Sequence, residues 1–264
     1  MGSEMCIRDR SLRVPARPRM SLDDWVMASS MTAETAHLLE QVVVRKLAFL
    51  VTGGTGSGKT TLLASLLGCV PAHERIVIVE DSRELSPDHE HVVSLEARAA
   101  NAEGRGQVSL TDLVRQSLRM RPDRVVLGEV RGAELRDMLM ALNTGHEGGC
   151  GTVHANGVQE VPARLEALAA LSGMNRPAAH AQVAAAFHLV LHLVRGPKGR
   201  RLAQIGVFEH VDGCAVVTQA LVFDEDLVCT PGPGAERLGD LVGEQTVSRV
   251  VQGQGRPRRA RRAA

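Results

Sequence analysis

The stretch LAFLVTGGTGSGKTTLLASLL, residues 47–67, decides the fold of this chain. It opens with an apolar run without alternation, which is typical of a strand buried on both faces of a parallel sheet. The run breaks into glycines, and a second apolar segment of helical length follows. Gly53, Gly58, Lys59 and Thr60 occupy the fixed positions of the pattern G-x-x-x-x-G-K-[ST]. The stretch therefore predicts a strand, a phosphate-binding loop and a helix, in that order.

The chemistry of this loop indicates a nucleoside triphosphate as its ligand. Glycines let backbone N–H groups turn inward around phosphates, and the following helix presents its positive N-terminus to them. We expect ATP and Mg²⁺ here, with Lys59 on the β- and γ-phosphates and the Thr60 hydroxyl on the metal. The expected ATP-binding residues are Gly53, Gly54, Thr55, Gly56, Ser57, Gly58, Lys59, Thr60 and Thr61.

Outside the loop, strands and helices alternate along the chain. The patterns predict strands at 75–81, 124–130 and 150–156, and helices at 21–29, 32–45, 109–120, 133–145 and 161–173. This alternation indicates an α/β fold, a parallel sheet flanked by helices. After about residue 186 the pattern changes to short strands at 186–194, 201–211 and 214–223. Gly-bearing turns join them, which predicts a C-terminal antiparallel meander.

The composition narrows the range of functions. The 264 residues carry a formal net charge of only +1, which argues against nucleic acid as a partner. Aromatic residues make up 2% and Tyr is absent, so stacking platforms for single strands are scarce. The five cysteines are scattered and never form a CxxC pair, which fits a reducing cytosol better than a disulfide framework or a zinc site. No apolar run approaches the ~20 residues of a membrane helix.

The segment RVVLGEVRG, residues 124–132, raises a question about the nucleotide site. It reads as a buried strand that ends in Gly128 and Glu129. An ATP-hydrolysing strand usually ends in Asp-Glu, with the Asp bound to Mg²⁺ through water. Gly128 therefore indicates either a damaged site or a different arrangement of the acids.

Three further stretches carry a family resemblance. They are VIVEDSREL with Glu80 and Asp81, LRMRPDRVVLGEVRGAE, and NTGHEGGCGTVHAN with His154. In this order and spacing they resemble the Asp box, the Walker B segment and the His box of the secretion traffic ATPases. These enzymes drive type II and type IV secretion and pilus assembly. Within the family, the residues of these stretches most resemble those of the branch that serves tight-adherence (Flp-type) pili in actinobacteria. The resemblance covers roughly 13–223 and implies a RecA-like P-loop NTPase core.

The resemblance also implies how the acids share the work. In that family the strand ends in Gly-Glu, so Gly128 is the family pattern, and Glu80 with Asp81 supplies the missing carboxylate. The carboxyl ends of parallel strands meet at one sheet edge, so Glu80, Glu129 and the phosphate loop are expected to converge. Either Glu129 or Glu80 would polarise the attacking water, and the sequence leaves open which. Asp81 is the expected second Mg²⁺ ligand beside Thr60.

Histidine and arginine residues complete the expected site. His154 follows a strand and is expected to sense the γ-phosphate or to contact a neighbouring subunit, against the alternative of a core or capping histidine. Arg98, Arg115 and Arg119 match family arginines that act in trans on transition-state charge. For Arg115 and Arg119 the alternative is a solvated basic helix face. His146, after a helix-ending glycine, is a further candidate.

The expected organisation follows from the same resemblance. Residues 1–10 read as a non-native leader, 11–45 as a linker and helices left from an absent N-terminal domain, 46–252 as the RecA-like ATPase domain, and 253–264 as a disordered basic tail. The family implies a homo-hexamer at the cytoplasmic face of the membrane that acts on an integral-membrane platform protein. Two alternatives remain open. One is a conjugation-type nucleic-acid translocase, and the other is a nucleotide-binding assembly scaffold that does not hydrolyse ATP.

Overall fold

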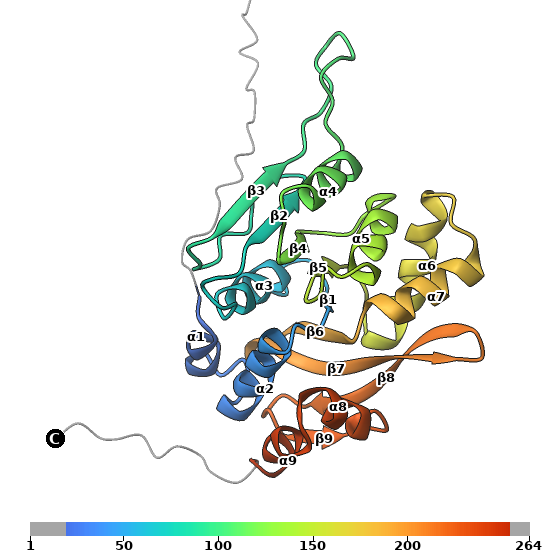
Figure 1. Cartoon of the computed structure of the whole chain (residues 1–264). Coiled ribbons are helices and arrows are strands. Elements are labelled where there is room, and N and C mark those ends of the chain that lie inside the picture. The colour runs from blue at the N-terminus through green and yellow to red at the C-terminus, as the bar shows by residue number, and fades with distance from the viewer. Residues whose placement is uncertain (1–19, 254–264) are drawn as a thin grey trace, which may run out of the picture.

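The computed structural model describes residues 20–253, and its strands form one sheet (Figure 1). The strand order across the sheet is β3-β2-β4-β5-β1-β6-β7-β8-β9. The strands are β1 (Phe49–Gly53), β2 (Ile76–Glu80), β3 (Val92–Glu96), β4 (Arg124–Leu127), β5 (Cys150–Val153), β6 (Leu189–Gly196), β7 (Gly199–Val211), β8 (Cys214–Phe223) and β9 (Cys229–Pro231). The predicted leader 1–10, the predicted linker as far as residue 19 and the tail beyond residue 253 lie outside the described residues.

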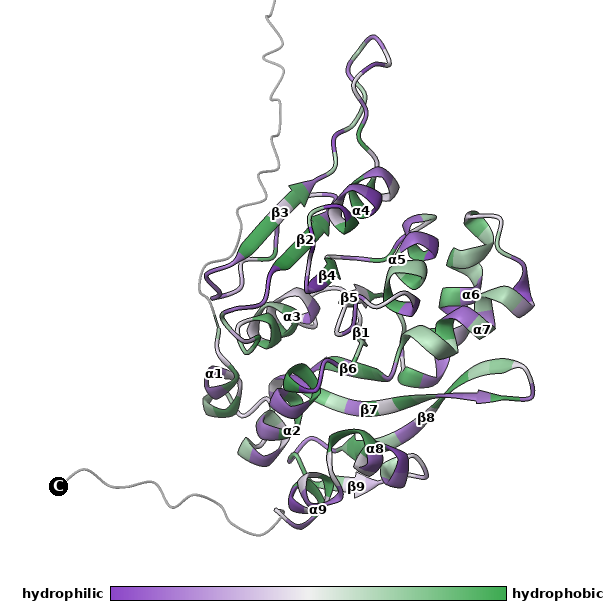
Figure 2. Cartoon of the chain, viewed as in Figure 1, coloured by the Kyte–Doolittle hydropathy of each residue, from purple (hydrophilic) through white to green (hydrophobic). Residues whose placement is uncertain are grey.

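Helices cover both faces of this sheet. They are α1 (Leu22–Met27), α2 (Ala33–Val44), α3 (Lys59–Leu67), α4 (Leu110–Leu118), α5 (Glu134–Asn143), α6 (Val161–Leu171), α7 (Arg176–Ala186), α8 (Ala235–Val242) and α9 (Glu244–Gln252). Figure 2 shows the central strands mostly in the hydrophobic colour and the helices in both colours, as expected of amphipathic helices around a buried sheet. Within residues 20–253, no helix combines the length and the apolar composition that crossing a membrane requires.

Side chains of the phosphate-loop strand divide between two hydrophobic clusters, one on each face of the sheet. Phe49 and Val51 join the cluster that also contains residues of α1, α2, α3, α8 and α9, whereas Leu50 joins the cluster built with α5, α6 and α7. All five residues of β1 are buried. Because both faces of β1 are covered, its sequence is apolar without alternation, as the reading of residues 47–53 requires.

The predicted α/β fold is confirmed, with one difference in the C-terminal strands. Strands β1 to β6 pair in parallel, and the antiparallel pairs begin only at β6 and β7. The segment 186–194 was expected in the meander, but β6 lies parallel to β1, with Phe49 opposite Leu189. Its first five residues are buried, so β6 has the burial of a central parallel strand rather than of a meander.

The sequence patterns missed the strands β3 and β9 and the helices α7, α8 and α9. β3 is a short strand at the edge of the sheet and is only partly buried, and Ser94 interrupts its apolar run. Helices α8 and α9 follow a Pro- and Gly-rich stretch and meet at Gly243, whose φ is +99°. Such residues usually indicate a loop, and only packing of Leu238 and Val247 into the core reveals the two helices.

The N-terminal helices pack onto the helix that follows the phosphate loop. Ser21 and Asp24 form the capping box that opens α1. One turn later, Trp25 is 1% exposed, and its indole N–H donates to Ser65 Oγ of α3 at 3.0 Å. Helix α1 is therefore fixed directly against the nucleotide-binding segment.

A buried ionic cluster closes the sheet at the end opposite the phosphate loop. Arg124 at the start of β4 is 1% exposed. Its guanidinium donates to Glu74 Oε2 at 2.7 Å and to the Val43 carbonyl at 2.8 Å, and Lys46 Nζ lies 3.3 Å from Glu74 Oε1. Burial raises the pKa of Glu74, but the hydrogen bond and charge of Arg124, followed by those of Lys46, outweigh burial and leave that pKa below its ordinary value.

We predict that Glu74→Ala lowers the free energy of unfolding by about 3–5 kcal/mol, because it leaves the buried guanidinium of Arg124 without its counter-charge. The double variant Glu74→Leu/Arg124→Met should recover most of that loss, since no buried charge remains. Urea unfolding followed by circular dichroism measures both. Equal losses in the single and double variants would contradict this explanation.

The same pair gives a pH dependence of stability. The pKa of Glu74 is lower in the folded chain, so its stabilisation is present above its ordinary value of 4.5 and is lost as pH falls through the folded value. The difference in unfolding free energy between the wild type and the double variant should therefore shift in favour of the variant below about pH 4.5. A constant difference from pH 7 to pH 3 would argue against a charged Glu74.

Candidate nucleotide site

The phosphate loop connects β1 to α3 in a conformation that its glycines make possible. Gly53, Gly56 and Gly58 have φ values of +146°, +74° and +101°, which side chains disfavour. A Cβ on Gly53 would lie 2.3 Å from the Leu193 carbonyl oxygen, so this position also lacks space. Gly58 is the N-cap of α3 and provides no side-chain cap. The first N–H groups of α3 are therefore open to an anionic ligand.

Lys59 lies at the centre of this loop. It is 8% exposed, and its ammonium group donates to the Gly53 and Gly54 carbonyls at 3.0 and 3.1 Å. Burial lowers the pKa of Lys59, while the Glu129 charge opposes the shift. Ser57 Oγ is also buried and has no hydrogen-bond partner among the described residues. A buried ammonium, an unpartnered hydroxyl and an uncapped helix end together fit the phosphates of a nucleotide.

The strand order places His154 between the loop lysine and Glu129. β5 lies between β1 and β4, and His154 follows its last residue. His154 Nδ1 is 3.5 Å from Lys59 Nζ, and its Nε2 is 3.3 Å from Glu129 Oε1. An ammonium can only donate, so the lysine favours the tautomer in which Nδ1 accepts and Nε2–H points to Glu129. Burial, followed by the Lys59 charge, lowers the pKa of His154, which favours the neutral imidazole near pH 7.

Arg131 holds the other side of Glu129. Its Nη2 donates to Glu129 Oε2 at 2.7 Å, and its Nη1 lies 3.4 Å from Asp81 Oδ2. Partial burial raises the pKa of Glu129, but the hydrogen bond and charge of Arg131, together with the charge of Lys59, outweigh burial and leave that pKa below its ordinary value. Glu129 is therefore a carboxylate at neutral pH.

Glu80 explains why position 128 is glycine. A Cβ on Gly128 would lie 2.5 Å from Glu80 Cγ, because the Glu80 side chain from β2 crosses the end of β4. Glu80 is 5% exposed, and its Oε1 accepts the N–H groups of Glu84 and Leu85 at 3.1 and 3.0 Å. Burial raises the pKa of Glu80 above its ordinary value, although the two hydrogen bonds act to lower it. The Glu80 side chain therefore lies directly beside Gly128 at the end of β4.

The structure places the remaining expected residues away from this group. Arg98 donates to the Gly106 carbonyl at 2.7 Å, within the projecting segment between β3 and α4 (Figure 1). Arg115 pairs with Asp137 of α5 at 2.9 Å. Arg119 is the exposed C-cap of α4. His146 lies half-buried after α5, with Nδ1 3.3 Å from the Ala141 carbonyl.

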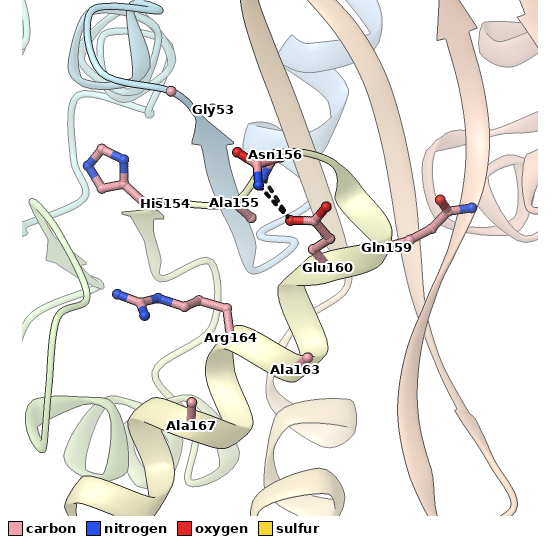
Figure 3. Close-up of a pocket in the computed structure, with 10 residues that line it drawn as sticks. Gly53, His154, Ala155, Asn156, Gln159, Glu160, Ala163, Arg164 and Ala167 are labelled. Atoms are coloured by element: carbon pink, nitrogen blue, oxygen red, sulfur yellow. Dashed lines mark hydrogen bonds between the residues drawn. The ribbon is translucent and has the colours of Figure 1, made fainter.

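A cavity beside the loop brings in residues that the sequence analysis missed. It is lined by Gly53, Gly54, His154, Ala155, Asn156, Gln159, Glu160, Ala163, Arg164 and Ala167. Figure 3 shows Arg164 extending from α6 toward His154, and Asn156 hydrogen-bonded to Glu160. Arg200 at the start of β7 donates to the Gly56 carbonyl at 3.1 Å. Asn156 belongs to the stretch NTGHEGGCGTVHAN, whereas Glu160, Arg164 and Arg200 lie outside the stretches that carry the resemblance, and only the fold brings them beside the loop.

We predict that Gly128→Ala lowers the free energy of unfolding by about 1–3 kcal/mol, since its methyl group overlaps Glu80. In a Glu80→Ala background the same change should cost little, because the obstructing Cγ is gone. Urea unfolding of the two single variants and the double variant gives the coupling between the positions. Additive losses would show that Glu80 does not limit position 128.

Comparisons with known proteins show which family the chain resembles over most of its length. The sequence profile of the family described as Type II/IV secretion system protein matches residues 6–226. A putative conjugal transfer protein of Mycobacterium tuberculosis is 56% identical over 204 residues, which are 77% of this chain and 58% of that protein. The type IV secretion system protein PtlH of Bordetella pertussis is 43% identical over 145 residues, which are 53% of this chain and 40% of PtlH.

A solved structure agrees in fold and, more distantly, in sequence. The crystal structure of the VirB11 ATPase from the Brucella suis type IV secretion system, in complex with sulphate, has a TM-score of 0.57 and 26% identity, covering 73% of this chain and 64% of that chain. This chain thus spans less than two thirds of the length of each of these three proteins. With a family match over most of its residues, the chain belongs to the type II/IV secretion system protein family.

Proposed function

We propose that this chain is the ATP-hydrolysing part of a secretion or pilus-assembly motor. The observation that carries this proposal is the chain of contacts from Lys59 through His154 to Glu129, beside a complete phosphate loop. The family match and the 26% identity to an ATPase of known structure support it. The substrate, ATP, would lie on the N-terminus of α3 with its phosphates around Lys59.

Lys59 would change partners when ATP binds. In the structure its ammonium is held by two carbonyls of its own loop. Phosphate oxygens would replace those carbonyls, since charge-assisted bonds are stronger than bonds to neutral oxygen. The same movement would change the contact between Lys59 and His154 Nδ1. Because His154 Nε2 also contacts Glu129, His154 would couple phosphate binding to Glu129. This is a concrete form of the sensing role expected for His154.

Glu129 is the better candidate for the group that polarises the attacking water. It is a partly exposed carboxylate that faces His154 and Arg131. Glu80 is buried, and the N–H groups of its own loop occupy its Oε1. A general base accelerates a reaction by a factor of about 10²–10⁴. We assign that contribution to Glu129 and a supporting role at the end of β4 to Glu80.

Mg²⁺ is the proposed cofactor, and it would neutralise charge on the β- and γ-phosphates. Thr60, in the first turn of α3, offers the hydroxyl that P-loop enzymes give to the metal. Among residues 20–253 there is no preformed cluster of three metal-binding side chains. Mg²⁺ in such sites keeps several waters and binds substrate oxygens, so one protein hydroxyl with nearby carboxylates fits its chemistry. Asp81, the second expected ligand, pairs with Arg131 in the structure.

We propose a homo-hexamer in which arginines of one subunit complete the site of the next. The segment between β3 and α4 projects from the body of the chain (Figure 1) and carries Arg98. Arg115 lies on the adjoining α4, where it pairs with Asp137, and Arg119 is the exposed C-cap of that helix. Groups placed in this way are suited to a neighbouring subunit's nucleotide. The motor would work at the cytoplasmic face of the membrane on an integral-membrane platform protein.

Nucleic-acid transport is a second candidate, favoured by the description of the Mycobacterium tuberculosis relative as a putative conjugal transfer protein. The net charge of +1 argues against strong nucleic-acid binding by this chain itself. Hydrolysis stimulated by DNA in a salt-dependent way would favour this candidate. A scaffold that binds ATP without turnover is the remaining alternative.

We predict that Glu129→Gln lowers the rate of ATP hydrolysis by at least ~10²-fold, because the amide cannot accept a proton from water. Binding of ATP should remain, since the loop is unchanged. Lys59→Ala is the matched control and should lose binding as well as turnover. A phosphate-release assay, run over a range of protein concentrations, measures the rates, and a fluorescent ATP analogue measures binding.

The concentration series separates the alternatives. A specific activity that rises with protein concentration supports sites completed between subunits. Equal background rates of hydrolysis in the wild type and Glu129→Gln, with ATP bound in both, would contradict an ATPase and favour the scaffold that binds ATP without turnover.

A further inference from the structure

The loops that follow β2 and β4 are joined at the nucleotide site by one side chain. Arg131 belongs to the segment after β4 and reaches Glu129 of the same segment and Asp81 of the segment after β2. β2 and β4 are neighbours in the sheet. One guanidinium therefore spans two acids at the carboxyl edge, a geometry that its fork of donors permits and an ammonium does not.

Exposure separates this contact from a stabilising core contact. The side chains of Arg131 and Asp81 are 57% and 48% exposed, and that of Glu129 is 23% exposed. Ion pairs this exposed contribute little to folding. The contact orients Glu129 instead, because Arg131 binds Oε2 while Oε1 faces His154.

The backbone of Arg131 is fixed independently. Glu134 is 5% exposed, and its Oε1 accepts the N–H groups of Arg131 and Gly132 at 2.6 and 2.7 Å. These bonds hold the turn into α5, so the Arg131 side chain starts from a rigid base. A residue with a fixed backbone and a guanidinium that donates from two nitrogens can place a carboxylate accurately.

We propose that Arg131 is a positioning residue that holds the Glu129 carboxylate where it can accept a proton from the attacking water, and that Asp81 acts through Arg131 rather than as a ligand of Mg²⁺. This inference rests on the proposed function and names a mechanism within the same site. It assigns Asp81 a role different from the metal ligand that the sequence pattern predicts. Positioning matters because a displacement of about 1 Å at a reacting group can cost about 10²-fold in rate.

The test is a double-mutant cycle in the full chain with Arg131→Gln and Asp81→Asn. Arg131→Gln should lower kcat by about 10- to 100-fold, with KM for ATP within about twofold. Asp81→Asn should cost less, because Arg131 still contacts Glu129. Asp81→Asn added to Arg131→Gln should have no further effect. Arg131→Lys should rescue only part of kcat, since an ammonium lacks the fork.

A binding measurement tests Asp81 without relying on turnover. A fluorescent, non-hydrolysable ATP analogue is titrated with MgCl₂ on the wild type and Asp81→Asn. The Mg²⁺ concentration for half-maximal binding should be the same in both. Thr60→Ala should raise that concentration and is the positive control.

The ion pair of Arg237 with Asp240 on α8 provides the matched surface control. Its side chains are 54% and 58% exposed and lie 3.7 Å apart, close to the values for Arg131 and Asp81. Arg237→Gln and Asp240→Asn should leave kcat unchanged. Circular dichroism and thermal melting check that each variant is folded. If Arg131→Gln does not fold, the cycle is carried out with Asp81→Asn and Arg131→Lys instead.

The inference is overturned if Asp81→Asn raises the Mg²⁺ requirement tenfold or more, or if the losses in Asp81→Asn and Arg131→Gln multiply. Failure of the proposed function is a separate result, because Glu129→Gln would then match the wild type in turnover. In that case equal Mg²⁺ requirements of Asp81→Asn and the wild type would still support Asp81 not being a metal ligand, and unequal ones would reject the inference.

Discussion

The position of β5 between the phosphate-loop strand and β4 is the constraint on which the candidate site depends. Because all three strands run parallel, their carboxyl ends deliver Lys59, His154 and Glu129 to one edge. His154 can therefore contact the lysine and the acid at the same time. If β4 lay directly beside β1, a side chain of β5 could not stand between the two.

Ion pairs lie at both ends of the sheet, and they differ in their effect on stability. At the amino ends, Arg124 and Glu74 form a buried pair whose disruption affects folding. At the carboxyl ends, Arg131 and Asp81 form an exposed pair that has little effect on folding. Lys59, held by carbonyls of its own loop, is a group that a ligand can release. Rigid strands thus carry charged side chains that can still exchange partners.

Much of this arrangement could be predicted from the sequence because it is encoded locally. The run from Phe49 to Lys59 specifies a buried strand, a glycine loop and a helix start from residue types alone. The capping boxes at Ser21 and Ser109 are equally local. Helices α8 and α9 could not be predicted in this way, because their Pro- and Gly-rich surroundings indicate a loop and only burial against the core makes them helical. The roles expected for Arg98, Arg115 and Arg119 remain predictions, since they concern a second subunit.

The sequence by itself determined the phosphate loop, the parallel sheet and the acids at its carboxyl edge, because hydrophobic runs, glycines and short spacings act through neighbours in the chain. Only the tertiary structure decided which position and which contacts each of the three acids has. Glu80 is buried across Gly128, Glu129 faces His154, and Asp81 lies on Arg131. These contacts join strands and loops that are distant in the sequence. Their geometry depends on strand order and on which side chain fills a given space, and no local pattern contains either.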